Sequence, residues 1–318
     1  PAKVLPFLRE NAFRKLVTRW EHEAGGSEAK AALPVEKARA TGEKEYSLVV
    51  EEAELEAWVA AATKAGRVAV DTETTNLDAT LAELVGISLC VEPGRACYIP
   101  VGHTGKESQG DLLGGGAEEA PKQIAKRRAL EILKPMLEDE SVLKIGQNIK
   151  YDLSIFARQD PSIAVAPIDD TMLISFALDA GLHGHGMDEL AELHLDWKTI
   201  HYADVAGKGK DQVTFDKVPL EAARDYAAED ADVTLRLYEV LKPRLLEQKQ
   251  TGFYELVERP LPPVVAAMER EGIKADPAVL RGLSEDFAKR LVVLEGEIHQ
   301  LAGREFNVAS PKQLGEIL

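Results

Sequence analysis

The stretch VAVDTETTNLD (residues 68–78) starts as a buried β-strand and then places two acids, Asp71 and Glu73, at the end of that strand. Side chains two positions apart on a strand point to the same face, so both carboxylates face the same way. Two like charges held side by side repel each other unless a cation lies between them. The stretch therefore predicts either two acids that face water or a pair that binds metal ions.

Length and composition limit the classes of protein to which this chain can belong. Its 318 residues suffice for two domains, and 45% hydrophobic with 29% charged residues is the balance of an ordinary globular protein. The net charge of −16 argues against binding nucleic acid mainly through a basic surface. No apolar run approaches the roughly 20 residues needed to span a membrane. Only two cysteines occur, which fits a reducing cytoplasm. We also expect the protein to be a monomer.

Three regions differ in their sequence pattern. Residues 1–45 predict a short amphipathic helix followed by a polar linker punctuated by Gly and Pro. Residues 46–250 alternate between strand and helix signals, and residues 251–318 are wholly helical. The last predicted helix, SPKQLGEIL (310–318), has hardly begun where the sequence stops. We interpret the chain as a piece truncated shortly after a new helical domain begins.

Within the middle region, the strands are predicted at 66–74, 84–92, 96–102 and 141–148. If Glu92 to Arg95 forms a tight hairpin turn, Cys90 and Cys97 lie across from each other as reduced thiols. Helices are predicted where apolar residues recur with helical spacing, at 121–139, 149–159, 168–180, 186–197 and 219–248. Asp170 is the expected N-cap of the third of these helices. This alternation predicts an α/β fold.

Two more acids stand out by their position. Asp152 comes early in the helix that follows the strand at 141–148. Asp230 lies four residues after Tyr226, so these two side chains share one face of the long helix. Both acids meet Asp71 and Glu73 if the strands at 66–74 and 141–148 are neighbours and the long helix packs across them.

Four carboxylates in one pocket cannot all stay ionised without cations. Oxygen ligands suit Mg²⁺ or Mn²⁺, and two such ions about 3.5–4 Å apart can hold the attacking and leaving oxygens of a phosphoryl displacement. Tyr226 would then hold the attacking water through its phenol oxygen. Glu229 and Asp232 flank Asp230 but project at other angles around the helix, so we leave them out of the site.

At these residues the chain resembles the proofreading 3′–5′ exonuclease domain of bacterial family-A DNA polymerases. The matching stretches are VDTETTNLD (70–78), IGQNIKYDLSIF (145–156) and YAAEDADVT (226–234). The resemblance covers roughly residues 46–250 and continues into helices similar to those that open the polymerase domain and lead to its thumb. It implies an RNase H-like (DnaQ-like) fold with a five-stranded mixed sheet. In the loop GLHGHGMDEL (181–190) the chain departs from relatives that carry a basic residue there.

The resemblance also implies residue roles. Asp71, Glu73 and Asp230 would bind the catalytic metal, and Asp71 with Asp152 the second metal. Tyr226 would orient the water. The residues that would contact the DNA strand are Leu77, which wedges against the terminal base, and Gln147, Asn148, Tyr151 and Tyr202.

The expected activity is metal-dependent removal of 5′-mononucleotides from the 3′ end of single-stranded or frayed DNA. The polymerase motifs are missing, so this chain cannot extend a primer, and the rest of a polymerase is an expected partner. Two alternatives stay open. One is an RNA-trimming exonuclease of the ribonuclease D type, which shares the order of the carboxylates. The other is a scaffold domain without catalysis.

A histidine pair attracts notice outside the carboxylate pattern. His183 and His185 are close enough in sequence to suggest a metal site. They lie in a Gly-rich loop, which is a poor platform for metal ligands. We therefore expect no metal at this pair.

Overall fold

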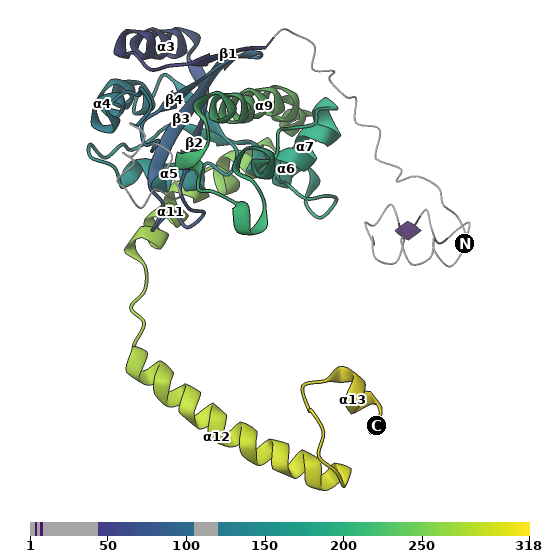
Figure 1. Cartoon of the computed structure of the whole chain (residues 1–318). Helices are drawn as coiled ribbons and strands as arrows, with labels where there is room; N and C mark the ends of the chain where they lie inside the picture. Colours follow the sequence, from purple (N-terminus) through teal and green to yellow (C-terminus); the bar gives the residue numbers. More distant parts are fainter. Residues whose placement is uncertain (1–3, 5–6, 9–43, 105–119) are drawn as a thin grey trace, which may run out of the picture. The chain divides into compact units, whose positions relative to one another are not determined.

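The structure, a computed structural model, describes residues 4, 7–8, 44–104 and 120–318, so the predicted N-terminal helix and most of the linker lie outside the described residues. The chain divides into two compact units, residues 1–270 and residues 271–318. The first unit contains a β-sheet with helices on both faces (Figure 1). The functional division predicted at residues 45 and 250 remains a prediction.

The sheet has six strands in the order β1-β4-β3-β2-β5-β6. The strands span Glu45–Leu48 (β1), Arg67–Thr74 (β2), Leu84–Glu92 (β3), Arg95–Pro100 (β4), Leu143–Gly146 (β5) and Ile168–Asp170 (β6). Strand β2 pairs antiparallel with β3 and parallel with β5, and the β1–β4 and β5–β6 pairs are also parallel. The sheet is therefore mixed, and β2, which carries the acidic pair, lies in its interior.

The prediction of five strands was wrong, because the sheet has six. Both edge strands are short: β1 has four residues and β6 has three. Runs of that length are too short to show the alternation that identifies a strand in a sequence. They form because each lies beside a longer strand whose backbone groups would otherwise be unpaired.

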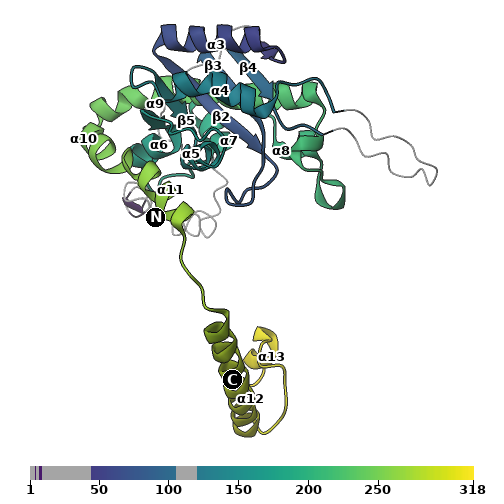
Figure 2. The ribbon, with the colours of Figure 1, turned by 90° about the vertical axis from the view of Figure 1, so that its left-hand side faces the viewer.

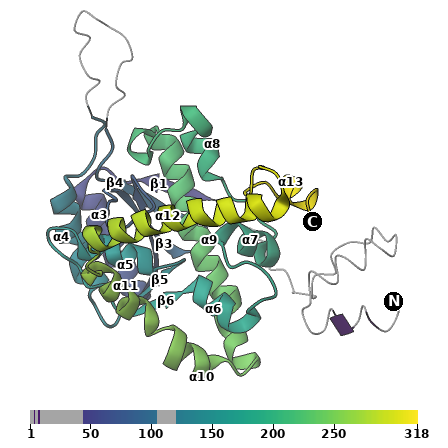
Figure 3. The same cartoon turned by 90° about the horizontal axis from the view of Figure 1, so that it is seen from below.

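Helices cover both faces of the sheet, and the three views agree on their placement (Figures 1–3). Helices α3 (Glu52–Ala65) and α4 (Lys126–Leu137) cover one face together with α5 (Lys150–Ala157). The long helix α9 (Leu220–Glu247) crosses the other face and contacts β1 to β5. Figure 3 shows the sheet between α3 and α4 on one side and α9 on the other.

The alternation of β2 decides which face receives each side chain. Val68 and Val70 pack into the core under α3 and α4, whereas Ala69 packs against Ala228 and Ala231 of α9. Since the period of a strand is two, the odd-numbered positions that follow Ala69 also face α9. Asp71 and Glu73 are therefore directed toward the long helix, as the sequence predicted. The predicted neighbours β2 and β5 are indeed paired, with Ala69 opposite Ile145.

The hairpin between β3 and β4 corrects one expectation. Cys90 lies opposite Ala96 and Cys97 lies opposite Leu89, with a register shift between Cys90 and Glu92. Cys97 packs in the core on the α3 side, and Cys90 packs in the cluster under α9. Both thiols are buried and free, and they do not face each other because an irregularity in the strand offsets the pairing by one residue.

The remaining helices of the first unit surround the α9 side and the β6 edge. They are α6 (Thr171–Asp179), α7 (Met187–Leu190) with the π-helical turn η1 (Ala191–Leu195), α8 (Tyr202–Ala206), α10 (Thr251–Phe253) with the π-helical turn η4 (Tyr254–Glu258), and α11 (Leu261–Glu271). Two short 3₁₀ turns, η2 (Gly209–Asp211) and η3 (Phe215–Lys217), precede α9. Asp170 caps α6 as predicted, because its carboxylate accepts a hydrogen bond from the Met172 amide.

The second unit consists of α12 (Pro277–Ala302) and α13 (Pro311–Gly315). Asp276 caps the start of α12 by accepting hydrogen bonds from two backbone amides, and Gly303 ends it in a left-handed conformation (φ 70°). None of the residues of α12 is buried. Among the described residues, no helix combines the length and apolar character needed to cross a membrane.

Candidate active site

Strand β2 places two acids side by side at the centre of the sheet. Asp71 lies opposite Ser88 of β3, and Glu73 lies opposite Gly86. A Cβ atom on Gly86 would lie 2.1 Å from the phenol oxygen of Tyr98, so only glycine leaves room for that ring. Tyr98 in turn is fully buried, and its phenol forms a 2.7 Å hydrogen bond with His103. The floor beneath the two acids is therefore tightly packed.

The other two acids come from helices on opposite faces of the sheet. Asp230 lies on α9, and one carboxylate oxygen each of Asp71, Glu73 and Asp230 lie within 4.8 Å of one another. Asp152 lies in the first turn of α5 and accepts a 2.5 Å hydrogen bond from the Thr72 hydroxyl. Thr72 points to the face opposite its two acidic neighbours, which is the face that α5 covers. Residues far apart in sequence thus meet at one point of β2.

The four carboxylates have almost no compensation for their charge. Among the residues that the structure describes, none of the four forms an ion pair with a lysine or arginine. Burial, followed by repulsion from the neighbouring carboxylates, raises the pKa of Glu73, Asp152 and Asp230 far above the ordinary values. Burial raises the pKa of Asp71 to about 7. The cluster is electrostatically unfavourable as it stands and would be stabilised by positive charge.

One buried oxygen points directly to this need. Oε1 of Glu73 has no hydrogen-bond partner. It is also buried, since the residue is only 8% exposed. A buried carboxylate oxygen without a donor is costly, and a divalent cation is the partner that suits an all-oxygen group. The residues present therefore fit a hard divalent metal ion at this site.

Aromatic residues line the site beside Asp230. Tyr226 lies one turn before Asp230 on α9, and its phenol is hydrogen-bonded to the Asp230 carboxylate. Burial and then the charge of Asp230 raise the pKa of Tyr226, so the phenol keeps its proton. Tyr202 packs edge-on against Tyr226 at 6.2 Å between ring centroids and stacks on Phe215 at 6.2 Å. Tyr202 is 36% exposed and offers a ring face near the carboxylates.

Three of the residues predicted to contact a strand line one groove. A cavity of about 490 Å³ lies between the loop after β2 and helix α5, with Leu77, Asn148 and Tyr151 on its wall. Leu77 is 95% exposed, so its side chain is available to a ligand. The phenol of Tyr151 donates a 2.5 Å hydrogen bond to the carbonyl of Asn76 and also contacts the Thr74 hydroxyl.

Gln147 lies apart from this groove, because its amide is used inside the protein. Its Oε1 accepts a 2.5 Å hydrogen bond from Thr171, and its Nε2 donates to the carbonyl of His185 at 2.8 Å. The backbone of Asn148 adopts a positive φ of 59° and its amide donates to Asp170. Gln147 therefore links β5 to the histidine loop rather than facing the groove.

Several residues that shape the site could not be identified from the sequence pattern. Thr72 holds Asp152, and nothing in an Asp-Thr-Glu triplet predicts that the threonine contacts a helix on the other face. Lys150, Arg158 and Arg270 bring positive charge to the 490 Å³ groove. Arg158 is anchored to carbonyls of the loop after β2, including that of Ala82 at 3.3 Å. Only the tertiary structure shows that these charges line the same groove as Leu77, Asn148 and Tyr151.

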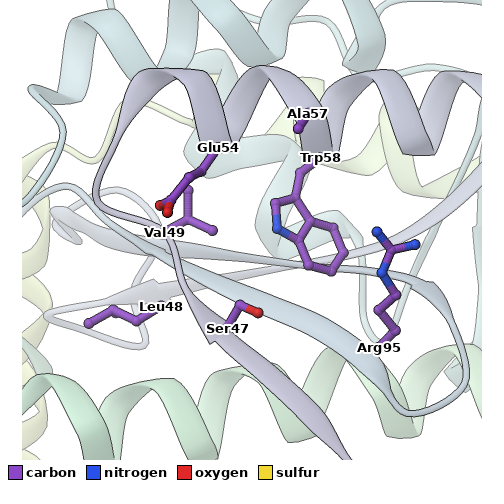
Figure 4. A pocket seen from close by; sticks show the side chains of 7 residues that line it. All are labelled: Ser47, Leu48, Val49, Glu54, Ala57, Trp58 and Arg95. Atoms are coloured by element: carbon purple, nitrogen blue, oxygen red, sulfur yellow. The ribbon is translucent and has the colours of Figure 1, made fainter.

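A second cavity of about 240 Å³ lies away from the acids, between α3 and the β1–β4 edge of the sheet (Figure 4). Trp58 and Arg95 line it, and the Arg95 guanidinium lies 5.1 Å from the centre of a Trp58 ring. Its other lining residues are Ser47, Leu48, Val49, Glu54 and Ala57. This set offers one acid and one hydroxyl but no histidine or lysine to act as a base, so we do not regard the cavity as a reaction site.

Comparison with known proteins agrees with this geometry. A DNA polymerase I from Rhizobium leguminosarum is 50% identical over 301 residues, which cover 92% of this chain and 28% of that protein. A DNA polymerase I from Pseudomonas aeruginosa is 40% identical over 323 residues, covering 99% of this chain and 33% of that protein. The chain therefore spans about a third of the length of these relatives.

Solved structures share the fold. The POL domain of Pol1 from M. smegmatis, in complex with DNA primer-template and dNTP, matches 85% of this chain and 40% of its own, with a TM-score of 0.65 and 19% identity. Brucella melitensis NrnC matches 68% of this chain and 90% of its own, with a TM-score of 0.50 and 22% identity. These likenesses support the RNase H-like type of fold, and residues 46–246 match the sequence profile of a 3′-5′ exonuclease. The chain belongs to the 3′-5′ exonuclease family of DNA polymerases of the A type.

Proposed function

We propose that this chain removes 5′-mononucleotides from the 3′ end of single-stranded or frayed DNA, as the proofreading domain of a DNA polymerase I. The observation that carries the proposal is a group of three carboxylates within 4.8 Å of one another, Asp71, Glu73 and Asp230, with the charge of Asp152 acting on the same group. Such a group is stable in its ionised form only with bound divalent ions. Hydrolysis of phosphodiesters is the reaction for which oxygen-bound Mg²⁺ or Mn²⁺ pairs are suited.

Each acid has a role in this proposal. Asp71, Glu73 and Asp230 would hold one ion, and Asp71 with Asp152 would hold the second. Bound there, two divalent ions would stabilise the charge on the attacking and leaving oxygens. Thr72 donates a 2.5 Å hydrogen bond to Oδ1 of Asp152, which fixes the position of that carboxylate. The close approach of the acids thus serves metal binding at the expense of local stability.

Tyr226 would position the attacking water. Its raised pKa keeps the phenol protonated, and the phenol proton is donated to Asp230. The phenol oxygen still has lone pairs with which it can accept a hydrogen bond from water. A water held in this way next to Asp230 is oriented for attack on a phosphorus atom.

The strand would be bound mainly through its terminal nucleotides. Leu77 is the exposed apolar side chain that would wedge against the last base, and the rings of Tyr202 and Tyr151 are surfaces for stacking. Asn148 lines the groove, whereas Gln147 would act by holding the neighbouring loop. Stacking does not depend on base identity, so we expect little sequence preference.

The relatives support DNA rather than RNA as the substrate, because the chain is 50% and 40% identical to two DNA polymerases over more than nine-tenths of its length. We also propose that the remainder of a polymerase packs against α12. An exposed apolar surface of this size on a helix is typical of a surface that binds a partner. The large apolar side chains that α12 exposes are Val279, Leu280, Leu283, Phe287, Leu291, Val292, Val293 and Leu294.

The domain roles follow from the same proposal. Residues 1–45 would form a connecting segment, residues 46–250 the exonuclease domain and residues 251–318 the start of the polymerase domain, leading to its thumb. We place the protein in the bacterial cytoplasm, associated with the nucleoid, as a monomer that meets DNA but no membrane.

The proposal is tested by following a 5′-labelled single DNA strand in the presence of Mg²⁺. The strand should be shortened from its 3′ end with release of 5′-mononucleotides, and Asp152→Ala should abolish the reaction. Asp225→Ala is the matched control, because Asp225 lies on α9 beside Tyr226 with a half-exposed side chain paired to Arg224. Its rate should equal that of the wild type.

Three results would overturn parts of the proposal. Activity that continues at the same rate in excess chelator contradicts the metal mechanism. An RNA strand of equal length and concentration that is shortened faster than DNA favours the ribonuclease D alternative. Failure to bind Mn²⁺ in calorimetry, with no shortening of either strand, favours a scaffold domain.

A further inference from the structure

A second cluster of potential metal ligands lies on the α9 side of the fold, around the loop that follows α6. Asp179 is the last residue of α6, His183 lies four residues later, and His194 lies in the π-helical turn η1 after α7. Figure 1 shows α6 and α7 next to each other beside α9. One ligand atom from each of the three residues lies within 4.8 Å of the other two.

His194 is the residue that most needs a partner. Its side chain is fully buried, and neither ring nitrogen has a hydrogen bond. A buried polar group without a partner is costly and rare in folded proteins. Burial, and then the nearby positive charge of Arg244, lowers the pKa of His194 to about 4. The imidazole is therefore neutral at physiological pH and presents a free nitrogen lone pair, which is the form that binds a metal.

His183 is held in the arrangement typical of a metal-binding histidine. Its Nδ1 lies 2.5 Å from the carbonyl oxygen of Gly184, so Nδ1 carries the proton and donates it. The lone pair is then on Nε2, which is buried, has no hydrogen bond and lies 3.6 Å from Oδ2 of Asp179. Metal-binding histidines commonly donate their second nitrogen to a carbonyl in this way, which fixes the tautomer.

Asp179 is oriented by Arg244. The Nη2 atom of Arg244 lies 2.9 Å from Oδ2 and 3.3 Å from Oδ1 of the carboxylate. An ionised carboxylate has about four lone-pair sites, so it can accept from one arginine and still bind a cation. Asp179 is 8% exposed and His183 is partly exposed, so the cluster lies near the protein surface.

We propose that Asp179, His183 and His194 form a binding site for a divalent transition-metal ion of the zinc class. Two imidazole nitrogens and one carboxylate oxygen form a ligand set suited to Zn²⁺ and related ions, whereas Mg²⁺ prefers oxygen alone. The site is separate from the four carboxylates and does not depend on the proposed nuclease activity. An ion bound there would join the end of α6, the loop 180–186 and η1.

The site also has a structural consequence for its loop. His185, two residues from His183, accepts through its carbonyl the hydrogen bond from Gln147 and contacts Ser175 through its ring. Gly181 has a positive φ of 76° and open space around its α-carbon, and Gly186 has the same open space. Glycine permits this turn of the backbone between α6 and His183, and an ion bound by His183 would fix the loop to α6 and η1.

The test is a titration of the purified, metal-free 318-residue chain with Zn²⁺ by calorimetry, in excess Mg²⁺ to occupy the carboxylates. One equivalent of Zn²⁺ should bind to the wild type and to Asp230→Asn. In His183→Gln the affinity should fall roughly 100-fold or more. Co²⁺ in place of Zn²⁺ should give the strong visible absorption of a site with nitrogen ligands and low coordination number. Saturation with Zn²⁺ at about 100 times the dissociation constant should raise the Tm by about 5–10 °C.

His201→Gln is the matched control, because this exposed histidine pairs with Asp188 and lies outside the cluster. It should bind Zn²⁺ as the wild type does. His194→Gln should also lose binding, and His183→Gln carries the test if the buried substitution fails to fold. Equal Zn²⁺ affinity in His183→Gln and wild type, loss of binding only in Asp230→Asn, or no binding to the wild type would each overturn the proposal.

Discussion

Helix α9 carries two kinds of acid within three residues. Asp232 is fully buried and fully compensated: its carboxylate accepts from the Tyr46 phenol at 2.9 Å, from the Gly94 amide at 2.8 Å and from Arg236 at 2.8 Å. Asp230, two residues earlier, has Tyr226 as a hydrogen-bond partner and otherwise faces carboxylates. The helix is the same and the residue type is the same, but only one of the two charges is satisfied.

Glu229, like Asp232, is a buried acid whose charge is compensated by its partners. It is 2% exposed, and its carboxylate forms an ion pair with Lys44 at 2.8 Å and accepts from Trp197 at 3.1 Å and from the Ile200 amide at 2.6 Å. The partners of Glu229 and Asp232 tie α9 to β1 and to the loops around it, which is a structural role. Burial of an acid therefore does not identify a functional site, whereas burial without compensating charge does.

The largest expected effect is on the rate of DNA shortening, and it distinguishes the two kinds of acid when Asp230→Asn is compared with Asp232→Asn. Asp230→Asn should slow shortening of a single DNA strand in Mg²⁺ by about 10³-fold or more, because it removes a proposed metal ligand. Its free energy of unfolding in chelator should stay the same or rise, because one charge leaves a repelling cluster. Rates and urea unfolding curves measure both effects.

Asp232→Asn completes the pair with the opposite signature. Arg236 then remains buried without its carboxylate, so the free energy of unfolding should fall by about 3 kcal/mol. Shortening by the folded protein should continue at the wild-type rate. If the two substitutions gave the same losses of rate and stability, the distinction between paired and unpaired acids on α9 would be wrong.

The sequence predicted the parts of this contrast that depend on local geometry. Alternation along 68–73 places Asp71 and Glu73 on one face, and the long helix with Asp230 packs on that face. At 100° per residue, Asp232 lies about 200° around the helix from Asp230, so its different direction was also predictable. The N-cap at Asp170 follows from the same short-range rules.

The parts that the sequence could not predict depend on contacts between distant segments. The contact of Thr72 with Asp152 joins residues 80 positions apart, and the pairing of β1 with β4 joins residues about 50 apart. The histidine cluster is a further case. The loop pair of His183 and His185 drew attention in the sequence, but His183 instead meets His194, which lies in a π-helical turn that no period of 3.6 residues indicates.

An effect of intermediate size is expected on how the free energy of unfolding depends on pH. In the absence of metal, the folded pKa values of the four carboxylates lie above the unfolded ones, with that of Asp71 at about 7. Between about pH 4 and pH 7 the folded state therefore binds more protons than the unfolded state, and this contribution to stability falls as pH rises. We expect a loss on the order of 3 kcal/mol across this range from Asp71 alone.

Urea unfolding in chelator at several pH values between 4 and 8 measures this loss. Asp230→Asn should reduce the slope, because it removes one of the interacting charges, whereas Asp232→Asn should leave the slope unchanged. Mn²⁺ should cancel most of the loss above pH 7 in the wild type, since a bound ion favours the ionised acids. A wild-type slope that Asp230→Asn does not change would show that the cluster is not the source of the pH dependence.

The smallest expected effect comes from removing one phenol from each kind of acid. Tyr226→Phe takes away the hydrogen bond to Asp230, which raises the pKa of that carboxyl further and leaves the attacking water less well oriented. The rate should fall about tenfold, and its rise with pH should move to higher pH, while stability changes by less than about 1 kcal/mol.

Tyr46→Phe removes the equivalent phenol from Asp232, where the hydrogen bond is 2.9 Å long. Here the loss should be about 1 kcal/mol of stability, because Asp232 keeps Arg236 and the Gly94 amide, and the rate and its pH profile should not change. Each variant deletes one phenol oxygen that is hydrogen-bonded to an aspartate of α9. A shift of the pH profile in Tyr46→Phe, or its absence in Tyr226→Phe, would mean that hydrogen bonding to Asp230 has no special part in the reaction.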